Sequence, residues 1–301
     1  MKDNFALRSL LERCELCPRK CGTDRLNGDM GFCGAGEKIK IARASLHMWE
    51  EPCISGENGS GTVFFSCCNM KCIYCQNYGI STQNKGMEVT PEELAYEFLS
   101  LQNQGANNIN LVTPTHYIPQ IISALDIAAE WGLNLPIVYN CGGYESVETL
   151  RLLRGYIDVY MPDMKYFSDK YAFEYSSASG YFDVAKAAIG EMFSQVGTPI
   201  FDEHGLMKKG VLVRHMMLPG LLFDTKRILD YLHRTYGDNI YISLMSQYTP
   251  MPGVKKHPKL SSRINSSHYQ AMIDYCLKLG IKNAFVQDES SATESFIPDF
   301  M

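Results

Sequence analysis

The chain has 301 residues, of which 46% are hydrophobic, and this length is enough for one large hydrophobic core or two modest ones. The formal net charge of −5 shows no excess of basic residues, so we do not expect nucleic-acid binding. No run of about 18 apolar residues is present, and the first residues lack the apolar stretch of a secretory signal, so we expect a cytoplasmic protein that does not enter a membrane.

Eleven cysteines are the most unusual feature of the composition, and in a reducing cytosol they indicate metal or cluster binding rather than disulfides. A first group follows the spacing C-x₂-C-x₃-C-x₁₁-C and comprises Cys14, Cys17, Cys21 and Cys33. Four thiolates satisfy a tetrahedral structural zinc, and they can equally hold a second iron–sulfur cluster that relays electrons. The sequence leaves both possibilities open, as well as the absence of any metal. We expect residues 1–60 to form this cysteine-rich metal-binding extension and residues 61–301 to form the core.

From Thr62 onward, short apolar runs alternate with longer amphipathic stretches. This alternation predicts βαβ units with a parallel sheet, arranged as a partial (β/α)₆ barrel or as a doubly wound sheet. The expected strands are 62–66, 109–113, 136–140, 157–161, 211–217 and 240–245. The expected helices lie near 91–104, 117–131, 145–154, 181–196, 223–236 and 266–279. Thr90-Pro91-Glu92-Glu93 predicts the start of the first of these helices, with a capping box.

Three connections, 67–89, 162–180 and 246–265, are too long for simple turns. Each follows the C-terminal end of an expected strand, which is where parallel α/β sheets place their ligands. The sequence therefore predicts an active site at this end of the sheet.

The first of these connections contains Cys68, Cys72 and Cys75 in the spacing C-x₃-C-x₂-C. Three close thiolates can hold three irons of a cubane cluster and leave the fourth iron open to another ligand. A zinc site completed by histidine or water, or unrelated thiols, are the alternatives. The preceding Cys67 would give C-x₄-C-x₂-C instead, and we assign the ligand role to Cys68 rather than to Cys67.

This spacing, with Tyr74 before the last cysteine, resembles the signature of the radical S-adenosylmethionine (SAM) superfamily. The resemblance implies the partial barrel, a [4Fe–4S] cluster, and SAM bound to the open iron. It also implies an electron donor such as flavodoxin or ferredoxin, whose electron cleaves SAM to a 5′-deoxyadenosyl radical that abstracts hydrogen from a substrate. Tyr74 occupies the position whose ring and backbone lie near the adenine in that family.

Three further stretches, 50–56, 110–117 and 246–250, resemble the pyruvate formate-lyase activating enzyme-like group, in particular its PflX-type branch. This narrower resemblance implies an anaerobic oxidoreductase that activates a protein glycine. A small metabolite is the alternative substrate. A non-catalytic iron–sulfur or zinc electron-transfer protein is the alternative class.

The resemblance also places the SAM contacts at the ends of successive strands. They are Thr113, Thr115 and His116 after the second strand, Asn140 after the third, Asp163 and Lys165 after the fourth, and Arg214 in the fifth. The second-strand positions replace a Gly-Gly-Glu motif that grips the SAM amino group, and no carboxylate is present there. Asp163 and Lys165 match an Asp-Leu-Lys motif that would hold the charged methionine end.

Each of these positions also has a simpler interpretation. His116 fits the start of a helix, Asn140 fits a strand-to-helix turn, and the Asp163–Lys165 pair fits a solvated loop. A buried guanidinium needs a partner, and strand alternation does not decide whether Arg214 or His215 points inward.

Overall fold

A computed structural model of the protein describes residues 4–287, and the last part of the expected core, residues 288–301, lies outside this range. Within the described residues a ten-stranded sheet runs in the order β10-β9-β8-β6-β5-β4-β2-β1-β3, with β7 paired to β8. The strands are β1 (Ile39–His47), β2 (Ser60–Phe65), β3 (Met87–Val89), β4 (Ile109–Val112), β5 (Ile137–Cys141), β6 (Val159–Pro162), β7 (Ile200–Phe201), β8 (Met207–Met216), β9 (Tyr241–Met245) and β10 (Ala284–Val286).

The six expected strands correspond to β2, β4, β5, β6, β8 and β9, and neighbouring members of this set pair in parallel. Strand β10 extends the parallel part of the sheet beside β9. The fold is therefore α/β with a mostly parallel sheet, and it is the partial barrel that the sequence predicts. Strand β8 begins at Met207, before the expected 211, because its first residues pair with β7 in a hairpin.

Beyond β2 the sheet continues with two antiparallel pairings, so that β1 runs against the parallel set and β3 runs in the same direction as that set. Strand β1 is antiparallel to β2, from Ile41 beside Phe65 to His47 beside Ser60, and β3 is antiparallel to β1. Sequence analysis predicted neither strand. Strand β1 lies within residues 1–60, which we expected to form a separate extension, and a division of the chain near residue 60 stays a prediction.

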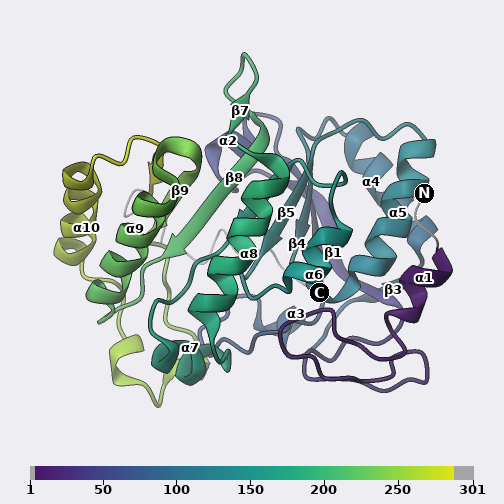
Figure 1. Ribbon diagram of the computed structural model, residues 1–301, viewed down its shortest axis with the longest axis horizontal. Coiled ribbons are helices and arrows are strands. Elements are labelled where there is room, and N and C mark those ends of the chain that lie inside the picture. The colour runs from purple at the N-terminus through teal and green to yellow at the C-terminus, as the bar shows by residue number, and fades with distance from the viewer. Residues whose placement is uncertain (1–3, 288–301) are drawn as a thin grey trace.

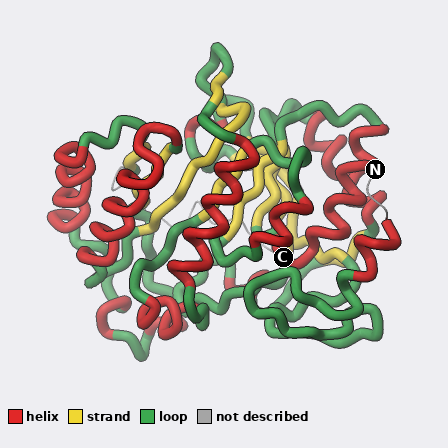
Figure 2. The backbone as a smooth tube through the Cα atoms, viewed as in Figure 1, coloured by secondary structure: helices red, strands yellow, loops and turns green. Residues whose placement is uncertain are grey.

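The helices lie in front of the sheet in Figure 1, and the tube in Figure 2 shows the same layer in red. The six expected helices are α4 (Pro91–Asn103), α5 (Ile118–Glu130), α6 (Val147–Leu152), α8 (Tyr181–Val196), α9 (Leu222–Tyr236) and α10 (Ser266–Leu279). Shorter, unexpected helices are α1 (Asn4–Ser9), α2 (Pro52–Ser55), α3 (Tyr78–Ser81) and α7 (Asp169–Ser176). Helix α4 packs on α5, α6 on α8 and α9 on α10, so neighbouring crossovers support one another.

The expected capping box opens helix α4. Thr90 Oγ1 accepts a hydrogen bond from the Glu93 backbone N–H at 3.2 Å, and Glu93 Oε2 accepts one from the Thr90 N–H at 2.8 Å. Two of the backbone donors near the start of the helix are thereby satisfied. The motif read from the sequence is confirmed.

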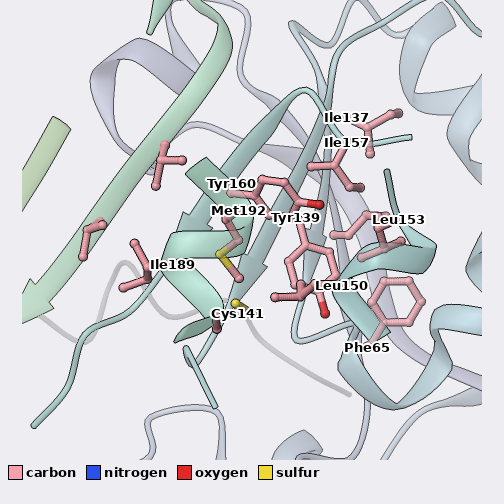
Figure 3. Packing of buried hydrophobic residues seen from close by; sticks show 14 of the residues in the cluster. Phe65, Ile137, Tyr139, Cys141, Leu150, Leu153, Ile157, Tyr160, Ile189 and Met192 are labelled. Carbon is pink, nitrogen blue, oxygen red and sulfur yellow. The ribbon is translucent and has the colours of Figure 1, made fainter. Parts of the chain in front are cut away.

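Alternation along the central strands divides their side chains between the helix layer and the barrel interior. Tyr139 of β5 and Tyr160 of β6 lie in the core formed with α6 and α8, their ring centroids 5.7 Å apart (Figure 3). Val138 and Val159, one residue earlier on each strand, pack in a separate cluster with α2. Asn140 follows Tyr139 and therefore returns to the interior side.

The N-terminal loops lie at the end of the sheet toward which the strand arrows point, below β3 in Figure 1. Arg19 connects them to the barrel. Its Nε donates to the Asn69 carbonyl at 2.6 Å, and its Nη2 donates to the Ser177 carbonyl at 2.5 Å. Among the described residues, no helix is long and apolar enough to span a membrane.

Candidate active site

A cavity of about 600 Å³ lies at the C-terminal ends of the parallel strands. Residues from the strand ends, from the loop after β2 and from the loop between β1 and α2 line it together. Of the residues that we expected to bind the cluster or SAM, the cavity brings together Cys68, Cys72, Tyr74, Cys75, Thr113, Asn140, Asp163, Lys165 and Arg214. These side chains lie in or soon after five different parallel strands, and only the parallel arrangement of the strands makes them neighbours.

Each of the three expected cluster cysteines meets a hydrogen-bonding group. Cys68 Sγ accepts the Met70 N–H at 3.4 Å, Cys72 Sγ accepts the Ser176 hydroxyl at 3.0 Å, and Cys75 Sγ lies 3.2 Å from Ser81 Oγ. Burial, reinforced by the neighbouring thiols, raises the pKa of Cys68 to about 12. Burial also raises the pKa of Cys72. These thiols must lose their protons to bind iron, so binding couples to proton release.

Helix α7 holds the cysteine loop in place. The Lys71 and Ile73 N–H groups donate to the carbonyls of Ser176 and Tyr175, at 3.1 and 2.9 Å. The Ser176 hydroxyl also contacts Tyr166, whose own hydroxyl lies 2.6 Å from that of Tyr74. The loop thus has a backbone connection and a side-chain connection to the same helix, which limits its freedom.

A network of charges forms the polar wall of the cavity. Asp163 accepts Lys165 Nζ at 2.5 Å and an Arg214 nitrogen at 3.0 Å. Arg214 also donates to Asn140 Oδ1 at 2.6 Å and to Glu50 Oε2 at 3.3 Å. Burial alone would raise the pKa of Asp163, but Lys165 and Arg214 outweigh it and lower that pKa. The Asp163 carboxylate is therefore ionised at neutral pH.

The structure decides which residue of β8 points inward. Arg214 lines the cavity, whereas His215 faces the helix layer, where its ring nitrogens contact the Met164 carbonyl at 2.7 Å and Thr225 Oγ1 at 3.0 Å. Burial lowers the pKa of His215 to about 4, so the ring is neutral at pH 7. The buried guanidinium has the partners that its charge requires.

Thr115 and His116 are not among the residues that line the cavity. They lie in the short 3₁₀ helix Thr115–Tyr117, which follows Pro114 and leads directly into helix α5. Thr115 donates to Glu145 at 2.8 Å, and His116 Nε2 lies 2.7 Å from the Ser66 carbonyl. The structure therefore does not bring these two residues to the expected SAM site, whereas Thr113 does line the cavity.

The N-terminal cysteines also lie outside the cavity. Cys14 and Cys33 are buried, Cys17 is half-buried and Cys21 is exposed. Across residues 4–287, no three His, Cys, Asp or Glu side chains surround one metal-ion position, and this holds for both cysteine groups.

Sequence analysis did not predict several of the residues that line the cavity. Glu50 and Glu51 come from the loop after β1, and Gln247 and Tyr248 follow β9. Burial raises the pKa of Glu51, against the opposing influence of Arg214. Sequence analysis had assigned residues 1–60 to an extension, so it did not place these carboxylates in the barrel. The adjacent acidic pair before Pro52 was the available signal.

The sequence profile described as the Radical SAM superfamily matches residues 62–232, which is more than half of the chain. The chain belongs to the radical SAM superfamily. This membership implies a [4Fe–4S] cluster and SAM as cofactors and supports an enzyme of oxidoreductase type. The cavity fits both groups, because it joins three buried thiols to polar side chains of both charge signs.

Comparison with individual relatives gives no substrate. The chain is 27% identical over 285 residues to an uncharacterized protein of Methanocaldococcus jannaschii, a match that covers 91% of this chain and 77% of that protein. The solved radical SAM structures that it resembles are more distant, and at their level of identity the likeness shows the fold alone.

Streptococcus suis SuiB bound to precursor peptide SuiA matches with a TM-score of 0.51 and 14% identity, over 73% of this chain and 46% of that chain. The protein anSMEcpe with bound AdoMet matches with a TM-score of 0.52 and 11% identity, over 79% of this chain and 62% of that chain. Methylornithine synthase matches with a TM-score of 0.50 and 17% identity, over 73% and 60%. The chain spans about half the length of SuiB.

Proposed function

We propose that this protein cleaves SAM reductively at a cluster held by Cys68, Cys72 and Cys75 and then abstracts a hydrogen atom from its substrate. The observation that carries the proposal is the single cavity in which these thiols meet the Asp163–Lys165–Arg214 network. When bound, the cluster and SAM together supply a 5′-deoxyadenosyl radical, which is the hydrogen-abstracting species.

The chain's own residues would bind and orient SAM. Lys165 offers an ammonium to a carboxylate, and Asp163 offers a carboxylate to an ammonium, so the pair can exchange its mutual contact for the two ends of the methionine moiety. Asn140 presents an amide that suits ribose hydroxyls. Tyr74 is buried beside Tyr248, with ring centroids 6.1 Å apart, and supplies aromatic surface near the last cysteine.

The decisive experiment is anaerobic reconstitution of the full chain with iron and sulfide, followed by SAM and dithionite and by measurement of 5′-deoxyadenosine and methionine. The control is the Cys68→Ala/Cys72→Ala/Cys75→Ala chain, which should form neither product. A wild-type protein that binds iron but forms no 5′-deoxyadenosine would contradict the proposal. It would instead favour the non-catalytic electron-transfer alternative.

For the substrate, we propose a protein glycine. The support is the match of Asp163 and Lys165 to the Asp-Leu-Lys motif of the activating enzymes and of Leu218-Pro219-Gly220 to a second of their motifs. A small polar metabolite is the second candidate, and it is favoured by the ionisable side chains of Glu50 and Arg214 in the cavity. Buried charges of this kind suit a compact ligand with complementary charges.

One assay separates these two candidates. A lysate from cells grown on deuterated glycine is divided by size into a protein fraction and a small-molecule fraction, and each is incubated with the reconstituted enzyme. Deuterium in 5′-deoxyadenosine from the protein fraction, with a glycyl radical signal in electron paramagnetic resonance, would support the first candidate. Deuterium only from the small-molecule fraction would contradict it.

The remaining expectations are part of the same proposal. The PflX-type branch, an anaerobic role and an electron donor such as flavodoxin or ferredoxin follow from the sequence resemblance. A cytoplasmic location follows from the lack of a long apolar run in the sequence. The test of the donor is 5′-deoxyadenosine formation when reduced flavodoxin replaces dithionite.

A further inference from the structure

Arg25 is a buried cation outside the active-site cavity. The residue is 1% exposed. Its guanidinium donates to two backbone carbonyls, to Gly36 at 3.0 Å and to His116 at 2.6 Å. Within residues 4–287 its hydrogen-bond partners include no carboxylate. Carbonyl dipoles alone are weak compensation for a buried charge, so an anion is expected close by.

The side chains that face this guanidinium are the thiols of the N-terminal segment. Arg25 Nη1 lies 3.9 Å from Cys14 Sγ, and its charge also reaches the thiol of Cys33. Cys14 in turn interacts with the thiols of Cys17, Cys21 and Cys33. Cys14 is therefore close to the other three cysteines and to Arg25, although among the described residues no three of these thiols surround one metal-ion position.

The backbone around these cysteines is shaped for sulfur ligands. Cys14 pairs with Thr23 in an isolated antiparallel bridge, which brings Cys14 and Cys21 together. Cys33 is followed by Gly34 at φ 82°, which L side chains adopt only with strain, and the next N–H, that of Ala35, donates to Cys33 Sγ at 3.4 Å. Such N–H to sulfur bonds favour a thiolate over a thiol, because they stabilise negative charge.

From this arrangement we propose that Cys14, Cys17, Cys21 and Cys33 bind a second metal centre through four thiolates, and that Arg25 balances its charge. Four thiolates keep a net negative charge whether they surround a zinc ion or a [4Fe–4S] cubane, so the same counter-charge serves either metal. The inference goes beyond the proposed function and does not depend on SAM cleavage.

The N-terminal segment contacts the cysteine loop of the active site, so a metal centre there could act on that loop whether it is a zinc ion or a cubane. Arg19 follows Cys17 closely and hydrogen-bonds to the Asn69 carbonyl, inside the loop that carries Cys68 and Cys72. Cys33 also interacts electrostatically with Cys67, the residue before Cys68. A zinc ion here would stiffen the wall of the active site. A cubane here would belong to the segment that Arg19 connects to the cysteine loop, and Cys21 would be its exposed ligand.

The test uses the full chain with Cys68, Cys72 and Cys75 replaced by Ala, so that only the N-terminal cysteines remain as ligands. We expect about one zinc per chain as purified, or about four irons after anaerobic reconstitution. Adding Cys14→Ser and Cys33→Ser should remove that metal. Equal metal content with and without these two cysteines would overturn the proposal. Failure of SAM cleavage in the wild type would not contradict the second metal centre, because no step of this test uses SAM.

The counter-charge is tested by Arg25→Met in the same background, with the exposed Arg13→Met as the matched control. We expect the Arg25→Met chain to lose its metal to a chelator at least about tenfold faster than the parent chain. The Arg13→Met chain should lose its metal at the same rate as the parent. Arg25→Lys keeps the charge and should retain most of the affinity, which also covers the case in which Arg25→Met fails to fold. Chelator sensitivity of Arg25→Met and Arg25→Lys equal to that of the parent would show that Arg25 is not the counter-charge.

Discussion

Asp163 is a carboxylate that lies between two cations, Lys165 and Arg214, and a second carboxylate, Glu50, contacts Arg214 from the other side. All four side chains are largely shielded from solvent, so the loss of one member leaves an uncompensated charge. A bound amino acid group would enter this network by replacing one of its contacts. We therefore expect the same balance of charges to recognise a zwitterionic ligand.

We predict that Asp163→Asn and Lys165→Met weaken SAM binding by roughly tenfold to a hundredfold, since a charge-assisted hydrogen bond contributes about 1.5–3 kcal/mol. SAM affinity, iron content and 5′-deoxyadenosine yield are measured on the same anaerobic samples, and iron content should not change. The control is the exposed pair Asp183 and Lys186, for which Asp183→Asn and Lys186→Met should have no effect. Wild-type affinity in both Asp163→Asn and Lys165→Met would exclude these residues from the site.

Cys67 and Cys68 provide a second prediction, because the two thiols lie in different surroundings. Cys67 has φ 76°, packs in the core of the sheet and accepts a weak hydrogen bond from Tyr117 at 3.7 Å. Cys68 borders the cluster of buried residues that contains Tyr74. Cys67→Ala should keep the absorbance of the reconstituted cluster, and Cys68→Ala should abolish it. The reverse result would assign the cluster to Cys67.

His116 gives the molecule a specific sensitivity to acid. Burial lowers its pKa to about 3, against an ordinary value of 6.5, so the folded protein keeps the ring neutral where the unfolded chain takes up a proton. This contribution to stability is complete above pH 6.5 and is lost as the pH falls toward the folded value, at about 1.4 kcal/mol per pH unit.

We therefore expect His116→Gln to flatten the fall in the free energy of unfolding between pH 6.5 and about pH 5, by about 2 kcal/mol at the lower value. Gln keeps a donor for the Ser66 carbonyl that His116 Nε2 contacts. Urea denaturation across this range measures the effect, with the exposed His204→Gln as control. Parallel curves for His116→Gln and the wild type would contradict this account.

Site residues could be predicted where an apolar run in the sequence shows the end of a strand and the family resemblance names the position. Asn140, Asp163 and Lys165 directly follow apolar runs, and all of them reach the cavity. His116 follows such a run too, but Pro114 starts a turn that directs it elsewhere, and a single sequence does not reveal that direction. Glu50 could not be predicted, because its place in the barrel depends on the antiparallel return of β1.

The secondary-structure elements with a strong hydrophobic pattern in the sequence were predicted, and those with a weak hydrophobic pattern were not. The six buried parallel strands and six longer helices are present as expected. Strands β3 and β10 have three residues each and are exposed or half-buried, so neither forms an apolar run long enough to predict a strand. In β1 only the first residues are buried, because one end of the strand continues to the cavity mouth.

The N-terminal segment and the cysteine loop meet through Arg19, and we predict that Arg19→Met loosens both. The guanidinium donates to Asn69 and Ser177, and removing these charged hydrogen bonds should cost about 1.5–3 kcal/mol. Iron loss from the reconstituted enzyme should accelerate, and limited proteolysis should cut near the segment earlier. The exposed neighbour Lys20→Met is the control. Unchanged iron loss and cleavage in Arg19→Met would show that the segment is held by other contacts.

At the scale of the whole molecule, ligands and fold are coupled because one cavity is lined by residues of β2, β4, β5, β8 and β9 and by the residues that follow β6. Bound SAM should therefore stabilise the native state as a unit, by about 2.7 kcal/mol at a concentration of about 100 times the Kd. We predict a rise of several degrees in the Tm of the reconstituted enzyme on addition of SAM. The Cys68→Ala/Cys72→Ala/Cys75→Ala chain should show little or none. An equal rise in both would mean that SAM binds without the cluster.

Strand β1 lies between β2 and β3, and it covers an edge of β2 that would otherwise face solvent. A shortened chain that begins at residue 61 would expose the backbone N–H and C=O groups of a strand that is buried along its whole length. Bare apolar edges of this kind pair with other chains and promote aggregation. Expression of soluble fragments should therefore start ahead of Ile39, so that the sheet keeps its protecting strand.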